Sequence, residues 1–158
     1  MSLTVRKAAE KDLPTLGRLG ASLMRLHYGL DERRFLAPGE HPEGGYAWFL
    51  GSQLSEPDVV VLVAERDDAV VGYIYAGLEP LSWKELRGPA GFIHDVVVDP
   101  QARHAGVATA LIDAALAWLG EEGAPRVVLW TAEQNVDAQR LFAARGFRRT
   151  MIEMTREL

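Results

Sequence analysis

The chain has 158 residues, 48% of them hydrophobic and 25% charged, a composition typical of one soluble globular domain spanning residues 1–158. Its formal net charge of -5 argues against a nucleic-acid partner, because phosphate contacts need an excess of Lys and Arg. Since there is no cysteine, disulfides, thiolate metal sites and a cysteine nucleophile are excluded.

The first part of the chain predicts a strand followed by two helices. Residues 1–7 lack the apolar core of a signal peptide and no run is long enough to span a membrane, so we expect a cytoplasmic protein without membrane contact. Leu3 to Lys7 alternates apolar and polar residues, as a strand does. Asp12 is placed to cap a helix. Residues 29–44 read as a surface loop and residues 46–54 as a short helix. The first helix would bury a stripe made of Leu13, Leu16, Leu19, Leu23 and Leu26.

Two apolar runs, residues 59–64 and 70–77, predict strands of a hairpin, since only the polar residues 65–68 separate them. Residues 79–89 then form an excursion before the next strand. It is either a substrate-facing flap or simply exposed.

Residues 92–98 are rich in β-branched and aromatic types and predict a strand that ends at Asp99-Pro100. A short loop, residues 101–106, leads directly into an apolar helical pattern over residues 107–119. The first amides of a helix have no internal partner and form an anion site, which the small Gly106 would make accessible. An ordinary strand-to-helix turn is the alternative.

The last third predicts a strand at residues 126–131, a helix at residues 136–145 capped by Asn135 and ended by Gly146, and a closing strand at residues 148–157. The order of elements predicts a three-layer α/β/α sandwich with a mixed, mostly antiparallel sheet.

Three segments in order resemble the GCN5-related N-acetyltransferase (GNAT) superfamily: the strand at residues 93–100, the loop Arg103-x-x-Gly106-x-Ala108, and Asn135-x-x-Ala138 with Leu141-Phe142 and Gly146-Phe147. The resemblance implies an acyl-CoA N-acyltransferase fold in which two central parallel strands splay apart and admit coenzyme A. Acetyl-CoA would then be the co-substrate, without a metal. The implied cofactor-binding residues are Val96, Val97, Val98, Arg103, His104, Ala105, Gly106, Val107, Ala108, Thr109, Asn135, Ala138 and Phe142.

Catalysis of acetyl transfer needs a base to remove a proton from the amine. Family members place a Glu-Asp pair where this chain has His94 and Asp95, so we expect His94 to be the base, with Asp95 orienting it or relaying through water. A strand histidine without a chemical role is the alternative. Where relatives often have a tyrosine acid this chain has Phe142, so either another tyrosine or water assists the leaving thiolate. Amides at Val96 or Val97, exposed by a bulge, would stabilise the oxyanion.

The acceptor site is expected near Tyr28, Tyr75 and Trp83. Lys and Arg number 10 against 15 Asp and Glu up to residue 100, but 6 against 5 in residues 101–150. This distribution fits a cationic primary amine of a small molecule or peptide better than an anionic acceptor; a solvated acidic surface is the alternative. The rival function is a non-catalytic acyl-CoA-binding or regulatory module. A homodimer, paired through the last strand, is a possibility by analogy.

Overall fold

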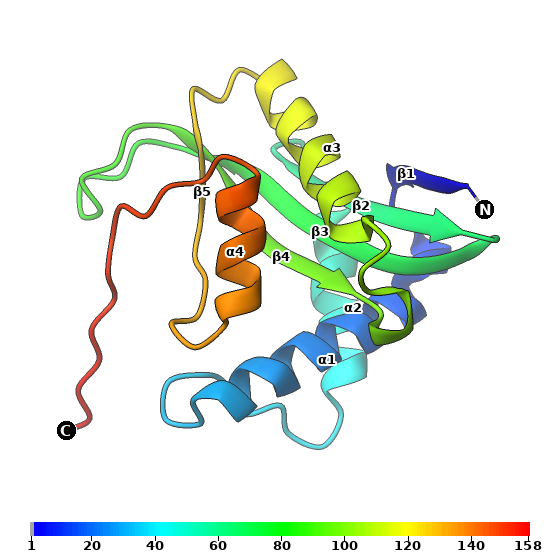
Figure 1. The fold of residues 1–158 in the computed structure, drawn as a ribbon, viewed down its shortest axis with the longest axis horizontal. Coiled ribbons are helices and arrows are strands. Elements are labelled where there is room, and N and C mark those ends of the chain that lie inside the picture. Colours follow the sequence, from blue (N-terminus) through cyan, green and yellow to red (C-terminus); the bar gives the residue numbers. More distant parts are fainter. Residues whose placement is uncertain (1) are drawn as a thin grey trace.

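The computed structural model describes residues 2–158 and has a five-stranded sheet in the order β1-β2-β3-β4-β5 (Figure 1). Neighbouring strands are antiparallel except β4 and β5, which are parallel. The strands are β1 Leu3–Lys7, β2 Val59–Arg66, β3 Ala69–Glu79, β4 Ala90–Val98 and β5 Val127–Leu129. The helices are α1 Leu13–Leu30, α2 Pro42–Gln53, α3 Val107–Glu121 and α4 Val136–Ala144, with 3-10 turns η1 Glu10–Asp12 and η2 Pro100–Ala102.

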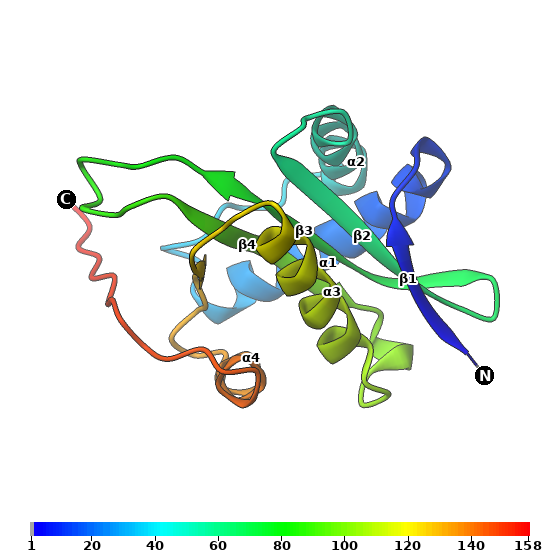
Figure 2. The ribbon, with the colours of Figure 1, turned by 90° about the horizontal axis from the view of Figure 1, so that it is seen from above.

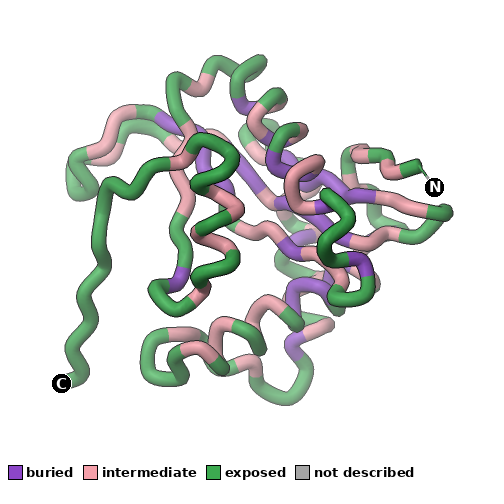
Figure 3. Tube along the Cα trace, viewed as in Figure 1, coloured by how far each residue is buried: buried purple, intermediate pink, exposed green. Residues whose placement is uncertain are grey.

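The sheet separates two apolar cores, as predicted for a three-layer sandwich. Helices α1 and α2 cover one face and α3 covers the other (Figure 2). The α1/α2 face buries Leu16, Leu19 and Leu50 against β2, β3 and β4. On the opposite face Leu111, Ile112 and other apolar residues of α3 fill the second core. Burial is concentrated in these central elements, whereas α4 contains no fully buried residue (Figure 3).

The predicted hairpin between β2 and β3 is present, with a turn of only two residues. Asp67 and Asp68 have φ angles of 53° and 62°. Two successive residues with positive φ are the signature of a type I′ turn, whose twist matches that of the flanking strands. Aspartate tolerates this conformation better than most residues, so the turn chemistry agrees with the pairing of the strands.

The helix at residues 46–54 and the strand at residues 126–131 were both predicted with the wrong length. Helix α2 begins earlier, at Pro42, which fits the first helical turn because it needs no amide partner there. Strand β5 is limited to Val127–Leu129, the part of residues 126–131 that pairs with β4 in the structure. Asp12 lies in η1 instead of capping α1 by its side chain; its carboxylate accepts from Ala9 and Arg6.

The closing strand predicted at residues 148–157 is wrong. In the part of the chain that the structure describes, this segment pairs with no strand and extends away from the sheet (Figure 1). Its apolar residues Met151, Ile152 and Met154 are 83%, 75% and 91% exposed. Ion pairs of Glu153 with Arg34 and of Glu157 with Arg33 hold it instead beside the α1–α2 connection. Alternation of residue types cannot produce a strand without a neighbour that supplies hydrogen bonds.

Strands β4 and β5 separate after a short paired stretch, as expected for a splayed pair. Gly91, Phe92 and Ile93 face Val127, Val128 and Leu129, and beyond Ile93 no described strand pairs with the β5 side of β4. The backbone edge of residues 94–98 is therefore open next to the N-terminus of α3.

Candidate active site

The loop before α3 presents a row of free amides. None of the described residues accepts a hydrogen bond from the amides between Arg103 and Thr109; the first intrahelical bond runs from the Ala110 amide to the Gly106 carbonyl. His104 and Gly106 have φ angles of 65° and 77°, which turn the loop into the helix. Residues 103–106 are exposed to solvent. This arrangement has the geometry of an anion site at a helix N-terminus.

The same segment is fixed in place by apolar anchors on both sides of the loop. Ala102 and Val107 are 2% exposed, and Leu111 is fully buried one turn later. Asp99 accepts a hydrogen bond from the Gln101 amide at 3.0 Å and shapes η2. A Cβ atom built on Gly106 would meet no atom within 4 Å, so an anion has free access to the backbone there. A diphosphate fits this site, since it needs several convergent amides and an unobstructed approach.

Strand β4 contains a bulge at His94. Tyr75 of β3 lies opposite Asp95, but the next residue, Ala76, lies opposite Ile93, so His94 has no partner of its own. The extra residue places His94 and Asp95 on the same, α1/α2 face of the sheet, where His94 meets Tyr75 and Asp95 meets Tyr46 of α2. A bulge in this strand was predicted from the sequence, as a means of exposing the amide of Val96 or Val97.

His94 lies on this face among aromatic rings and one carboxylate. Its ring centroid is 4.8 Å from that of Tyr75, and it stacks on Phe92 at 5.8 Å. Its Nε2 lies 3.7 Å from the Glu79 carboxylate. Burial lowers the pKa of His94 and outweighs the opposing charges of Glu79 and Asp95. The imidazole is therefore neutral at pH 7 and available to accept a proton.

Asp95 is bound to two tyrosine hydroxyls and forms no hydrogen bond with His94. Tyr46 donates a short hydrogen bond to Oδ2 of Asp95, and Tyr73 donates to the same oxygen at 2.9 Å. Burial raises the pKa of Asp95 above its usual value and outweighs the two donated hydrogen bonds, which favour the carboxylate. The pKa values of Tyr46 and Tyr73 are raised mainly by burial, so both phenols stay protonated and act as donors.

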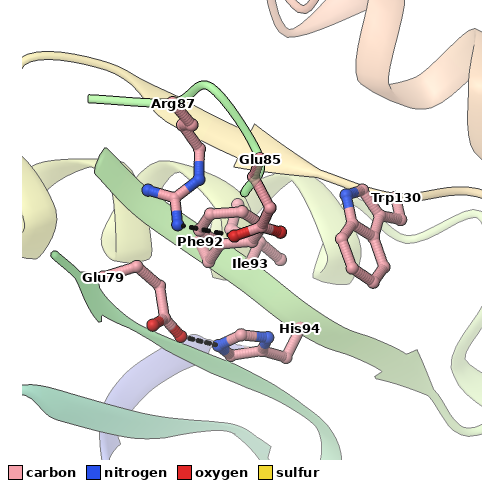
Figure 4. A pocket seen from close by; sticks show the side chains of 7 residues that line it. All are labelled: Glu79, Glu85, Arg87, Phe92, Ile93, His94 and Trp130. Atoms are coloured by element: carbon pink, nitrogen blue, oxygen red, sulfur yellow. Dashed lines mark hydrogen bonds and ion pairs between the residues drawn. The ribbon is translucent and has the colours of Figure 1, made fainter. Parts of the chain in front are cut away.

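A cavity of about 250 Å³ lies directly beside His94 (Figure 4). In Figure 4 the Glu79 carboxylate points toward the imidazole, while Trp130 lies on the opposite side of the hollow. Arg87 comes from the connection between β3 and β4, and it pairs with Glu85 at 3.1 Å. The cavity is lined by Glu79, Glu85, Arg87, Phe92, Ile93, His94 and Trp130.

The connection of residues 80–89 is held in one conformation by Arg87. The guanidinium donates to the carbonyl of Pro80 at 3.2 Å and to that of Gly88 at 2.9 Å. It also lies over the ring of Phe92, 4.9 Å from its centroid. Ser82 and Arg87 form an isolated antiparallel bridge across the connection. These contacts bring the wall formed by Glu85 and Arg87 over the face that carries His94.

The other residues singled out from the sequence are scattered around this centre. Asn135 caps α4 by accepting from the Ala138 amide at 3.2 Å. Phe142 is partly buried and packs edge-on against Phe147, at 6.1 Å between ring centroids. Tyr28 lies half-buried on α1, and Trp83 is 85% exposed on the β3–β4 connection. Neither Tyr28 nor Trp83 lines the cavity beside His94.

The fold also brings to the site four residues that the sequence did not predict there, namely Tyr46, Glu79, Phe92 and Trp130. Glu79 had a weak signal, because it is a carboxylate at the end of an otherwise apolar strand. Tyr46 had none, since it follows Gly44-Gly45 in a helix with little amphipathic pattern. Among residues 2–158, no group of three or more His, Cys, Asp or Glu side chains is arranged to hold a metal ion. No helix in this range is long and apolar enough to cross a membrane.

Comparison with known proteins gives matches over most of the chain. A mycothiol acetyltransferase from Thermobispora bispora is 32% identical over 146 residues, which are 85% of this chain and 49% of that protein. The chain thus spans about half the length of the curated mycothiol acetyltransferases it matches.

Solved structures share the fold at lower identity. A mutant of a Bacillus halodurans protein superposes with a TM-score of 0.84 and 19% identity, covering 98% of this chain and 99% of that one. Aminoglycoside N-acetyltransferase AAC(6')-Iy, in complex with a bisubstrate analogue of coenzyme A and acetylneamine, gives a TM-score of 0.78 at 21% identity, with 100% and 99% coverage. The family described as "Acetyltransferase (GNAT) family" matches residues 24–147, and this chain therefore belongs to the GNAT acetyltransferase family.

Proposed function

We propose that this chain transfers the acetyl group of acetyl-CoA to a primary amine of a small molecule or peptide, by direct attack of the amine in a ternary complex. The observation that carries the proposal is the row of free amides from residue 103 to residue 109 beside a strand whose bulge presents His94. Membership of the acetyltransferase family supports it. The coenzyme A ligand of a structural relative is consistent with it.

Coenzyme A would be held by two parts of the fold. The amides of residues 104–109 would bind its diphosphate, with Arg103 adding a positive charge. The open edge of β4 near Val96 and Val98 would hydrogen-bond the pantetheine arm as an added strand does. Asn135, whose amide group already caps α4, would contribute a further polar contact. When bound, acetyl-CoA supplies a thioester carbonyl for attack.

His94 is the proposed general base. It takes a proton from the attacking amine as the new C–N bond forms and the C–S bond breaks, and the thiolate leaves. Its lowered pKa keeps it neutral for this task. Asp95 lies beside His94 and adds a carboxylate to that of Glu79. The backbone amide of Val96 or Val97 would donate a hydrogen bond to the thioester carbonyl oxygen as negative charge develops there. Phe142 cannot protonate the thiolate, so another tyrosine or water would assist that step.

A cationic acceptor fits the charges around His94. Glu79 and Glu85 line the cavity, and Asp95 lies on the same face of the sheet. Among the described residues that line the cavity, Arg87 is the one permanent cation, and it pairs with Glu85. The Glu79 carboxylate, 3.7 Å from the neutral His94 ring, is therefore available to an ammonium group. Tyr75, whose ring lies beside His94, supplies an aromatic surface on which an ammonium group binds favourably.

The decisive assay measures thiol release from acetyl-CoA with a panel of polyamines, amino acids, aminoglycosides and peptides. We expect turnover with at least one cationic amine, and a lower kcat/KM for the His94→Ala variant with loss of the acidic limb of its pH profile. Coenzyme A binding without turnover on any acceptor would favour the non-catalytic module. An unchanged acidic limb in His94→Ala would remove this residue from the mechanism.

We also propose that two copies associate through residues 148–157. Strand β5 is at the edge of the sheet, and the extended segment exposes Ile152 and Met154. If each copy placed its segment of residues 148–157 beside β5 of the other copy, both β5 and the segment would gain a strand partner. Such a reciprocal exchange would produce a two-fold symmetric dimer. Sedimentation analysis should show a dimer that dissociates in the double variant Ile152→Lys, Met154→Lys. A monomer at every concentration of the unchanged chain contradicts this part of the proposal.

A further inference from the structure

A polar cluster under the α1/α2 layer holds Asp95, the neighbour of the proposed base, and includes two tyrosines that take no part in the proton transfer described above. It consists of Tyr46 from α2, Tyr73 from β3 and Asp95 from β4, and it ties one helix to two central strands. Both hydroxyls donate to the same carboxylate oxygen of Asp95. Hydrogen bonds to a charged group in such a half-buried setting are among the stronger ones in proteins. The cluster therefore restrains Asp95, which follows the bulged residue His94 directly.

Tyr46 is itself held in place by the close approach of α1. A Cβ atom built on Gly20 would lie 2.2 Å from Cδ1 and 2.5 Å from Cγ of the Tyr46 ring. Only glycine leaves room for the ring at this position. On its other side the ring meets Phe49 edge-on, with centroids 6.2 Å apart. The hydroxyl of Tyr46 is thus delivered to Asp95 by a side chain that has little freedom to move.

We propose that Tyr46 is a positioning residue for the reaction proposed above: by holding Asp95 on the α1/α2 face, it fixes the bulge of β4 that carries His94. A bulge has one unpaired residue and an interrupted ladder, so its geometry depends on contacts outside the sheet. Tyr73 donates to Asp95 from the neighbouring strand, whereas Tyr46 donates from a helix and so ties Asp95 to the α1/α2 layer. Tyr46 acts through Asp95 and touches no reacting atom.

Kinetics of Tyr46→Phe test this role. We expect kcat to fall by about 10- to 100-fold, as for small displacements of catalytic groups. The Kd for coenzyme A should change by less than kcat does, since the amides proposed to bind its diphosphate lie at the N-terminus of α3, away from Tyr46. Gly20→Ala should lower kcat similarly, because it displaces the ring and leaves the hydroxyl in the chain. Ser52→Ala, which removes a hydroxyl hydrogen bond to Phe49 elsewhere on α2, should leave kcat at the wild-type value.

A double-mutant cycle with Asp95→Asn separates positioning from a merely structural effect. If Tyr46 acts through Asp95, adding Tyr46→Phe to Asp95→Asn should change kcat less than twofold. If Tyr46→Phe instead lowers kcat by the same factor with and without Asp95→Asn, the two residues act independently and the inference is overturned. A wild-type kcat for Tyr46→Phe in an enzyme that does turn over would also overturn it.

Hydrogen exchange gives a readout that requires no turnover. Those amides of residues 94–97 that pair with β3 should exchange at least tenfold faster in Tyr46→Phe than in the unchanged protein, while those of α3 keep their rates. Equal exchange at residues 94–97 would overturn the positioning role even if no acceptor amine is found. Absence of turnover in the unchanged protein would instead count against the proposed function alone.

Discussion

Replacing Gly106 by alanine tests the anion site at its most sensitive point. The φ angle of 77° lies in the left-handed region, and a Cβ atom there would meet no other atom within 4 Å. The cost is therefore backbone strain alone, about 1–2 kcal/mol of unfolding free energy. Gly120 lies in the same helix without positive φ, and its Cβ position is equally open. Gly120→Ala should accordingly stabilise the fold by up to about 1 kcal/mol.

Coenzyme A adds a second measurement on the same variants. A ligand at 100 times its Kd stabilises the native state by about 2.7 kcal/mol. In Gly106→Ala the strained backbone is expected to relax and turn its amides away from the diphosphate. A tenfold loss of affinity would remove about 1.4 kcal/mol of that stabilisation. Urea unfolding with and without coenzyme A measures both effects, with the Gly120→Ala protein as the matched control.

Two results would refute this reasoning. Unfolding free energies of Gly106→Ala at or above that of the unchanged protein would show that the left-handed conformation is not required. Equal stabilisation of both variants by coenzyme A would show that its phosphates bind elsewhere.

Three further substitutions probe other parts of the structure. Asp12 is 5% exposed, and its pKa is lowered first by the Arg6 hydrogen bonds at 2.8 and 3.0 Å. Asp12→Asn should therefore lower the free energy of unfolding by about 1.5–3 kcal/mol above pH 4. In acid unfolding curves this difference from the unchanged protein should vanish as pH falls through the lowered pKa of Asp12. A difference independent of pH would refute the ion-pair account. Asn135→Ala removes the cap of α4 and should lower the free energy of unfolding, measured in urea, by about 1 kcal/mol. Gln134→Ala, one residue earlier, is the control and should not show this loss. Phe142→Tyr should raise kcat in the thiol-release assay if protonation of the thiolate limits turnover, and an unchanged kcat would show that it does not.

Local sequence rules were enough for the elements whose physics is local. The hairpin formed by two apolar strands with a short polar connection, the strand ending at Asp99-Pro100 and the cap at Asn135 each follow from the preferences of the residues themselves. The free amides before α3 belong to this class as well, because any helix leaves its first N–H groups unpaired. This is why the candidate diphosphate site could be predicted without a structure.

The acceptor side of the site depended on contacts between residues far apart in the chain. Glu79 meets His94 only because β3 and β4 pair in one register, and the extra residue at His94 cannot be read from the strand alone. Tyr46 reaches Asp95 across 49 residues, through the packing of α2 on α1 at Gly20.

The C-terminal segment shows the same division between local preference and tertiary partners. Residues 148–157 have the alternation of a strand, yet within residues 2–158 no neighbouring strand pairs with them. The sequence by itself determined which segments prefer helix, strand or turn and where an anion could bind, since these depend on neighbouring residues. Only the tertiary structure decided which side chains face one another and which strand lacks a partner, because pairing and packing energies depend on the whole chain.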